Sequence, residues 1–209
     1  MSGFNISLEK IIKIINNKNS NIFFTSDLHF FHSKILSLRE QFNDVDQMNN
    51  ELISLWNNKV SKNDVVFYLG DFSFGKQNDT IGILKKLNGH IIFICGNHDY
   101  KFKRGDYDNY LAYKCDIFEH SLPIKIKNEN GTFDIIDNNH FVMCHFPIFE
   151  WNKMHYGSVH LYGHVHAKNL DDVLGGRAVN VTYDFNHTIL SIEDIYNKFK
   201  NVLTFRSHH

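Results

Sequence analysis

The sequence contains few cysteines and no long apolar run. Cys95, Cys115 and Cys144 are its only cysteines, and they lack the CxxC spacing of a zinc knuckle or a redox pair. No run of about 18 apolar residues is present that would span a bilayer, and the N-terminus lacks the basic-then-apolar pattern of a secretory signal. We therefore expect reduced cysteines in a soluble, cytoplasmic protein with no membrane partner.

The chain also lacks a strong net charge. Twenty-two Lys and Arg residues oppose 23 Asp and Glu residues, which leaves a formal charge of -1. Such a balance gives no broad field that would draw the protein onto long nucleic acid, so we expect no extended nucleic-acid binding. The hydrophobic content of 43% is ordinary for a globular chain. We expect one domain over residues 1–209, in which the closing residues 206–209 resemble the start of a purification tag.

The first half of the chain alternates predicted strands and helices. Short apolar runs that stop at polar residues predict buried strands, and longer stretches with apolar residues on one face predict helices. This alternation is typical of a parallel α/β arrangement. After a polar amphipathic opening at 8–15, the strands are expected at 22–24, 65–69 and 91–95, and the helices at 33–40, 46–59 and 78–87.

Strands dominate the second half. A hairpin is predicted around Glu129-Asn130-Gly131, and a last helix at 192–199. The two halves together predict an α/β fold in which two sheets pack face to face with helices outside. Segments 100–115 and 147–157 have no regular apolar period, so we expect loops at the rim of a site there. The expected strands are 123–127, 132–136, 141–144 and 159–162.

Five polar clusters each follow a predicted strand directly. The carboxyl ends of neighbouring strands in an α/β sheet share one edge, and sites form in the crevice beyond it. We therefore expect these side chains to converge. The clusters are Asp27-Leu28-His29, Gly70-Asp71, Gly96-Asn97-His98-Asp99, His145 and Gly163-His164-Val165-His166.

The residue types in these clusters are those of a transition-metal site. Asp27 and His29 would lie on the same side of an extended segment, as would the two histidines of His164-x-His166. A lone Asp71 after a strand suits a bridge between two ions through its two oxygens. Mixed oxygen and imidazole donors favour Mn, Fe, Zn or Ni over Ca, and the lack of thiolates argues against a structural zinc site.

Each cluster alone has an ordinary structural explanation. Asp-x-His occurs often by chance, Gly-Asp usually forms a turn or a cap, and a single His after a strand is more often a satisfied core residue. Gly-Asn-His-Asp and Gly-His-x-His after apolar strands are much rarer. Five clusters in this order, each at a strand end, favour a functional site over coincidence.

This order of motifs resembles the calcineurin-like metallophosphoesterase superfamily over residues 21 to about 185. The resemblance implies a four-layer α/β sandwich with two mixed sheets. It also implies one ion held by Asp27, His29, Asp71 and His166, and a second held by Asp71, Asn97, His145 and His164. His98 would contact the phosphate and protonate the leaving oxygen, and Asp99 would orient or polarise His98, although Asp99 also suits a turn or a surface position.

The chain further resembles a group of small, capless phosphoesterases found in bacteria and viruses. It departs from that group at Phe31, which precedes His32, and at Thr182-Tyr183, where glycine-bearing sequences are more usual. His32 and Arg39 suit either a phosphate clamp or a helix surface. For the remaining candidates, packing in the aromatic core is preferred over a place beside the substrate. These candidates are Phe149, Trp151 and Tyr156.

The predicted activity is hydrolysis of small phosphodiesters, such as cyclic nucleotides or nucleotide-like esters. Two divalent ions, with Mn²⁺ favoured, would lower the pKa of a bridging water, and the resulting hydroxide would attack in line. The partner is thus a small phosphate ester. A phosphomonoesterase, a protein phosphatase or a nuclease on the same fold remains an alternative. A non-catalytic metal-binding scaffold is an alternative of another class.

Overall fold

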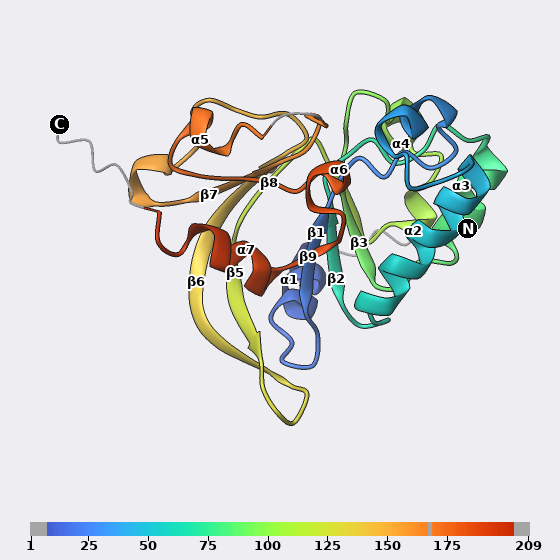
Figure 1. Ribbon diagram of the computed structural model, residues 1–209. Helices are drawn as coiled ribbons and strands as arrows, with labels where there is room; N and C mark the ends of the chain where they lie inside the picture. The colour runs from blue at the N-terminus through green and yellow to red at the C-terminus, as the bar shows by residue number, and fades with distance from the viewer. Residues whose placement is uncertain (1–7, 167–168, 203–209) are drawn as a thin grey trace.

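The structure is a computed structural model that describes residues 8–166 and 169–202, and its strands form two sheets (Figure 1). The first sheet has the order β4-β3-β2-β1-β9. Strands β1 to β4 run parallel, and β9 pairs antiparallel with β1. The bounds are β1 Ile22–Thr25, β2 Val65–Tyr68, β3 His90–Ile94, β4 Tyr113–Cys115 and β9 Leu190–Ser191.

The second sheet has the order β5-β6-β7-β8. Strands β5 and β6 form a long antiparallel hairpin that extends beyond the body of the molecule (Figure 1), and β6, β7 and β8 run parallel. Both sheets are therefore mixed, as the resemblance implied. The bounds are β5 Ile117–Lys127, β6 Phe133–Cys144, β7 Val159–Tyr162 and β8 Arg177–Asn180.

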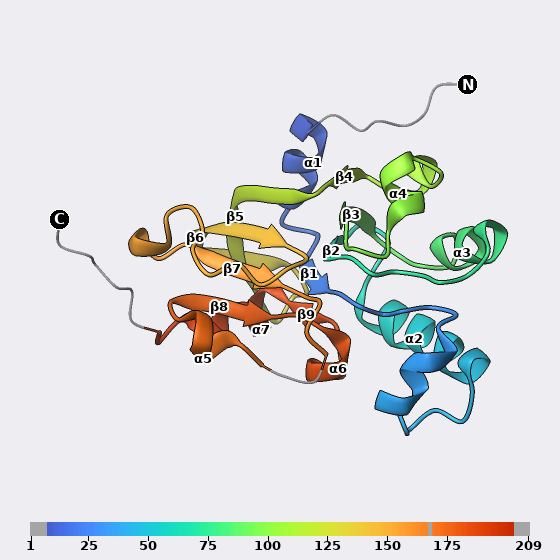
Figure 2. The same cartoon turned by 90° about the horizontal axis from the view of Figure 1, so that it is seen from above.

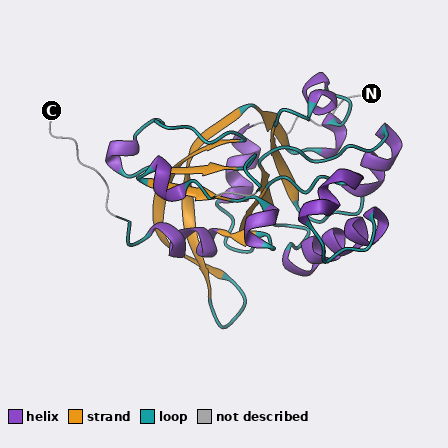
Figure 3. Cartoon of the chain, turned by 45° about the horizontal axis from the view of Figure 1, so that its top comes forward, coloured by secondary structure: helices purple, strands orange, loops and turns teal. Residues whose placement is uncertain are grey.

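Helices lie on the outer sides of the paired sheets (Figures 2 and 3). Helices α2, α3 and α4 cover the first sheet, and α5 lies outside the second. Helices α1 and α7 close the space between the sheets with apolar residues such as Ile11 and Ile195. The helices are α1 Leu8–Ile15, α2 Val45–Lys59, α3 Gln77–Leu84, α4 Tyr100–Arg104, α5 Asp171–Leu174, α6 Tyr183–Asn186 and α7 Ile192–Phe199, with 3-10 helices at Ser33–Leu38, Asp108–Tyr110 and Met154–Tyr156.

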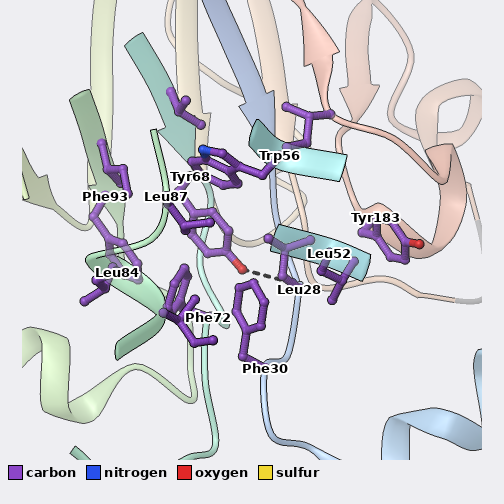
Figure 4. Close-up of a cluster of buried hydrophobic side chains, with 14 of the residues drawn as sticks. Leu28, Phe30, Leu52, Trp56, Tyr68, Phe72, Leu84, Leu87, Phe93 and Tyr183 are labelled. Carbon is purple, nitrogen blue, oxygen red and sulfur yellow. Dashed lines mark hydrogen bonds between the residues drawn. The ribbon is translucent and has the colours of Figure 1, made fainter. Parts of the chain in front are cut away.

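Alternation along the strands divides the core into layers. In β2, Val66 and Tyr68 face the helices, whereas Val65 and Phe67 face the second sheet. This period of two is what a strand buried on both faces produces. Figure 4 shows the helix-side cluster, in which Trp56 of α2 packs near Tyr68. Burying one such side chain stabilises the fold by about 1.5–3 kcal/mol, so this packing fixes the strand ends in place.

Several local expectations differ from the structure. Segments 132–136 and 141–144 belong to one strand, β6, because its polar middle pairs with β5 at an exposed position where polarity costs little. Segment 33–40 is a 3-10 helix that ends at Leu38, since Arg39 leaves helical geometry with φ of -130°. Segment 100–115 is not an irregular loop but contains α4, a 3-10 helix and β4, each too short to show a period.

The last predicted helix is confirmed. Helix α7 spans the predicted residues 192–199. The three cysteines are free, and burial raises the pKa of Cys95 and Cys115 to about 12, which keeps both thiols protonated. Within the described ranges, no helix has both the length and the apolar character needed to cross a membrane. The closing residues 206–209 lie outside the described residues.

Candidate metal centre

The structure brings the five polar clusters to one edge of the paired sheets. Each cluster directly follows its strand, namely β1, β2, β3, β6 or β7. Two groups of side chains form there, and within each group the candidate ligand atoms lie within 4.8 Å of one another. The first group is Asp27, His29 and His166, and the second is Asp71, His145 and His164.

The first group surrounds an unpaired carboxylate oxygen. Asp27 is fully buried, and its Oδ1 has no hydrogen-bond partner among the residues that the structure describes. That oxygen lies 3.6 Å from Nε2 of His29 and 3.5 Å from Nε2 of His166. The two imidazole nitrogens lie 3.2 Å apart, close to the roughly 3.0–3.4 Å expected for two nitrogens that each lie about 2.1 Å from one ion. An orphaned buried oxygen facing two imidazoles fits a divalent cation.

The charges in this group are mutually dependent. Burial alone would raise the pKa of Asp27, but the nearby imidazoles of His29, His145 and His166 outweigh it and lower that pKa. Burial alone would lower the pKa of His166, but its hydrogen bond to Asp184 and the charge of Asp27 raise it. The carboxylate of Asp27 is therefore held in its anionic, ligating form.

Two acceptor atoms face each other where Asn97 contacts the second group. His145 is fully buried, and its Nδ1 lies 2.7 Å from the carbonyl oxygen of Leu69, so in the neutral ring the proton belongs on Nδ1. Its Nε2 then has a free lone pair, yet lies 2.9 Å from Oδ1 of Asn97. In this neutral form the two acceptors repel each other, and a cation that both atoms contact would remove the repulsion. A backbone carbonyl that fixes the tautomer of a histidine ligand is common in metal sites.

Asp71 belongs to the second group and also faces the first. Its Oδ2 is 4.0 Å from Nε2 of His29 and 3.6 Å from Nε2 of His145. Its Oδ1 accepts a hydrogen bond from the backbone N–H of His98 at 2.9 Å. The sequence suggested a bridge through both oxygens. Oδ2 is the atom that faces His29 and His145, whereas Oδ1 keeps a second lone pair beside its hydrogen bond, so a bridge through both oxygens stays a prediction.

The backbone around the site is not extended, contrary to the expectation for Asp-x-His. Asp27, His29, Asp71 and His164 all have positive φ, between 52° and 68°. Non-glycine residues adopt this region rarely, and strain of this kind concentrates at functional sites. The segment is held in this form by backbone hydrogen bonds from Asp27 to Gly70 and from His29 to Asp71.

Two glycines of the motifs are required by close contacts. A Cβ on Gly96 would lie 2.3 Å from Oδ1 of Asp71, and a Cβ on Gly163 would lie 2.5 Å from Oδ2 of Asp27. Real Cβ atoms essentially never approach so closely. The absence of a side chain at these positions lets the third and seventh strands bring their loops against the two carboxylates.

His98 and Asp99 have different environments. The His98 side chain is 49% exposed, and its Nε2 lies 3.9 Å from Oδ2 of Asp71. Asp99 is buried, and its carboxylate accepts hydrogen bonds from the backbone N–H groups of Asp71, Phe72 and Gly96 at 2.6, 3.1 and 2.8 Å. Burial raises the pKa of Asp99, although these amides oppose the shift. Its contacts thus tie two motif loops together, and the expected effect on His98 stays a prediction.

The residues that the sequence offered as weaker site candidates differ in how deeply they are buried. Arg39 is 1% exposed, which rules out a helix-surface position. His32 is half-buried against Phe74, and burial together with His29 and His98 lowers its pKa to about 4. Trp151 packs in the core as expected. The same expectation is wrong for Phe149 and Tyr156, which are 69% and 89% exposed.

Three further residues support the site, of which Tyr68 and Asp184 were not assigned a role from the sequence and Arg39 was a candidate phosphate clamp. The hydroxyl of Tyr68 accepts from the N–H of Leu28 and donates to the carbonyl of Asp71, which links both motifs to the core (Figure 4). Arg39 and Asp184 form a buried ion pair beside His166. The sequence offered one signal for these supporting roles, the polar hydroxyl of Tyr68 in an otherwise apolar strand. Nothing in the sequence marks Asp184.

Comparison with known proteins agrees with this arrangement. Residues 20–176 match the model of the calcineurin-like phosphoesterase family, and the chain belongs to that family. Proteins of this family use divalent metal ions, and the two donor groups fit such ions.

Individual relatives agree with this assignment. The chain is 31% identical to uncharacterized protein MJ1445 of Methanocaldococcus jannaschii over 72% of each chain. It is 27% identical to the gene 66 protein of Mycobacterium phage L5, over 88% of this chain and 96% of that protein. The crystal structure of AQ665, a protein of unknown function from Aquifex aeolicus, matches with a TM-score of 0.61 at 19% identity, over 85% of this chain and 98% of that one, which supports the fold.

Proposed function

We propose that this chain hydrolyses small phosphodiesters with two divalent ions, Mn²⁺ being favoured. The observation that carries the proposal is the position of Asp71 Oδ2, which lies 4.0 Å from His29 and 3.6 Å from His145, between the two donor groups. Bound there, two ions would neutralise the phosphate oxygens and lower the pKa of a water between them. The ligands would be Asp27, His29, Asp71 and His166 for one ion, and Asp71, Asn97, His145 and His164 for the other.

His98 is proposed as the general acid. Its ring is half-exposed beside Asp71, so a substrate can reach Nε2. The backbone N–H of His98 donates to Asp71 Oδ1, which anchors the backbone of His98 next to the proposed bridging carboxylate. A proton delivered to the leaving oxygen typically contributes 10²–10⁴-fold to the rate, and the benefit grows with the basicity of that oxygen.

The preference for a diester is supported by the position of Arg39. A monoester dianion carries one more negative charge than a diester, and a nearby arginine would usually balance it. Arg39 follows the first motif but is committed to Asp184 and to two backbone carbonyls. It therefore cannot clamp a phosphate, which favours the monoanionic substrate.

The test compares bis-p-nitrophenyl phosphate with p-nitrophenyl phosphate in the presence of Mn²⁺. We expect a higher kcat/KM for the diester. His98→Ala should keep the metal content and lower kcat by about 10²–10⁴-fold, most strongly for diesters with poor leaving groups. A preference for the monoester would favour a phosphomonoesterase instead, and loss of an ion in His98→Ala would make His98 a ligand.

A further inference from the structure

The side chain of Arg39 makes four hydrogen bonds to oxygen atoms in the interior, although Arg39 follows a short, mostly exposed 3-10 helix. Its Nε and Nη2 donate to the two carboxylate oxygens of Asp184 at 2.5 and 2.9 Å. Its Nη2 also donates to the backbone carbonyl of Asp27 at 2.6 Å, and its Nη1 to that of Leu28 at 2.8 Å. The guanidinium packs over the ring of Tyr183 at 4.9 Å. One side chain thus connects α6 with the Asp27 motif.

Asp184 continues this connection to a proposed metal ligand. Its Oδ2 lies 2.5 Å from Nδ1 of His166. Both of its oxygens also accept hydrogen bonds from the guanidinium of Arg39, and the side chains of this ion pair are 1% and 6% exposed. The carboxylate is therefore an anion that accepts the Nδ1 proton, which leaves the lone pair of His166 on Nε2. That atom is the one that faces Asp27 and His29.

We propose that Arg39 and Asp184 are positioning residues that pre-form one of the two ion sites, an inference that rests on the proposed function. Asp184 fixes the tautomer and direction of His166. Arg39 fixes Asp184 and holds the carbonyls of Asp27 and Leu28, which stabilises the left-handed backbone that Asp27 adopts at φ of 58°. The imidazole of His166 and the backbone of Asp27 are thereby kept in place without the metal.

The connection is specific to one of the two donor groups. His145 in the second group is oriented by the backbone carbonyl of Leu69, and among the described residues neither Arg39 nor Asp184 has a hydrogen bond to that group. Loss of the pair should therefore weaken one ion far more than the other. A residue that only stabilised the fold would weaken both ions together.

The experiment is a Mn²⁺ titration of metal-free protein by calorimetry, with electron paramagnetic resonance at each step. Wild type should bind two ions that give the spectrum of a coupled pair. Asp184→Asn should raise the dissociation constant of one ion by about 10–100-fold and leave the other unchanged, so that an isolated Mn²⁺ spectrum appears at intermediate Mn²⁺. Asp106→Asn is the matched control, because it breaks the exposed Arg104–Asp106 pair and should change neither ion.

Other outcomes separate the two proposals. Wild type that binds no ion pair would refute the proposed function. Wild type with two ions, and folded Asp184→Asn with the same two affinities, would refute only the positioning role. If circular dichroism shows that Asp184→Asn does not fold, Arg39→Lys replaces it, because a lysine cannot reach both oxygens of Asp184 and two carbonyls. In addition, nitrogen NMR of metal-free wild type at about pH 9 should show His166 protonated at Nδ1, and protonation at Nε2 would overturn the inference.

Discussion

Asp99 illustrates how a single buried carboxylate can organise the loops of a catalytic site. It accepts backbone N–H groups from Asp71, Phe72 and Gly96, so two loops that follow different strands share one anchor. These amides would otherwise be buried without partners. Asp99 therefore holds the backbone of Asp71 directly through a hydrogen bond. An effect of Asp99 on the adjacent residue His98 would come in addition.

We predict that Asp99→Asn destabilises the fold by about 1–3 kcal/mol, because the amide group of Asn presents N–H donors to backbone donors. Urea unfolding measures this loss. The kcat should fall by a similar factor for all leaving groups, since the whole loop moves. A fall in kcat that grows with the basicity of the leaving group would instead show that Asp99 acts through the proton of His98.

Strand β7 shows how an element fixes a neighbouring loop. His160 on β7 is fully buried, its Nδ1 donates to the carbonyl of Val142, and its Nε2 accepts from the N–H of Ile148. Both ring nitrogens have hydrogen-bond partners only in the neutral form. Protonation would place a hydrogen on Nε2 that points at the backbone N–H of Ile148. Burial accordingly lowers the pKa of His160 from 6.5 to about 4.

We predict a pH dependence of stability from this element. The unfolded chain binds a proton on His160 below pH 6.5 and the folded chain only below about 4, so stability falls as the pH drops between these values. The full loss corresponds to about 3 kcal/mol. His160→Gln should remove this part of the slope in urea unfolding between pH 7 and about 4, while replacement of the exposed His155 by Gln should not. Equal slopes for wild type and His160→Gln would contradict the prediction.

The sequence predicts some helices and strands better than others. The apolar runs before Asp27, Asp71 and Asn97 predict their strands well, because buried parallel strands leave a strong local pattern. Strand β8 and helix α6 were missed, because neither contains an apolar run and their placement depends on contacts far along the chain. The Arg39–Asp184 pair joins positions 145 residues apart, which no local pattern encodes.

At the scale of the whole molecule, the site depends on the face-to-face packing of two sheets. The first sheet supplies Asp27, Asp71 and Asn97, and the second supplies His145 and His164. Neither sheet alone provides a complete set of donors for either proposed ion. The apolar layer between the sheets, with Phe24 stacked between Phe67 and Phe141, therefore sets the distance across the centre.

If two ions share Asp71, activity should require both ions, and a metal titration of hydrolysis measures this. Metal-free protein is titrated with Mn²⁺ while hydrolysis of bis-p-nitrophenyl phosphate is followed, with Asp71→Ala as the comparison. We expect no hydrolysis without metal, recovery that is complete only at two ions per chain, and no recovery in Asp71→Ala. Hydrolysis by verified metal-free protein, or full recovery at one ion per chain, would contradict it.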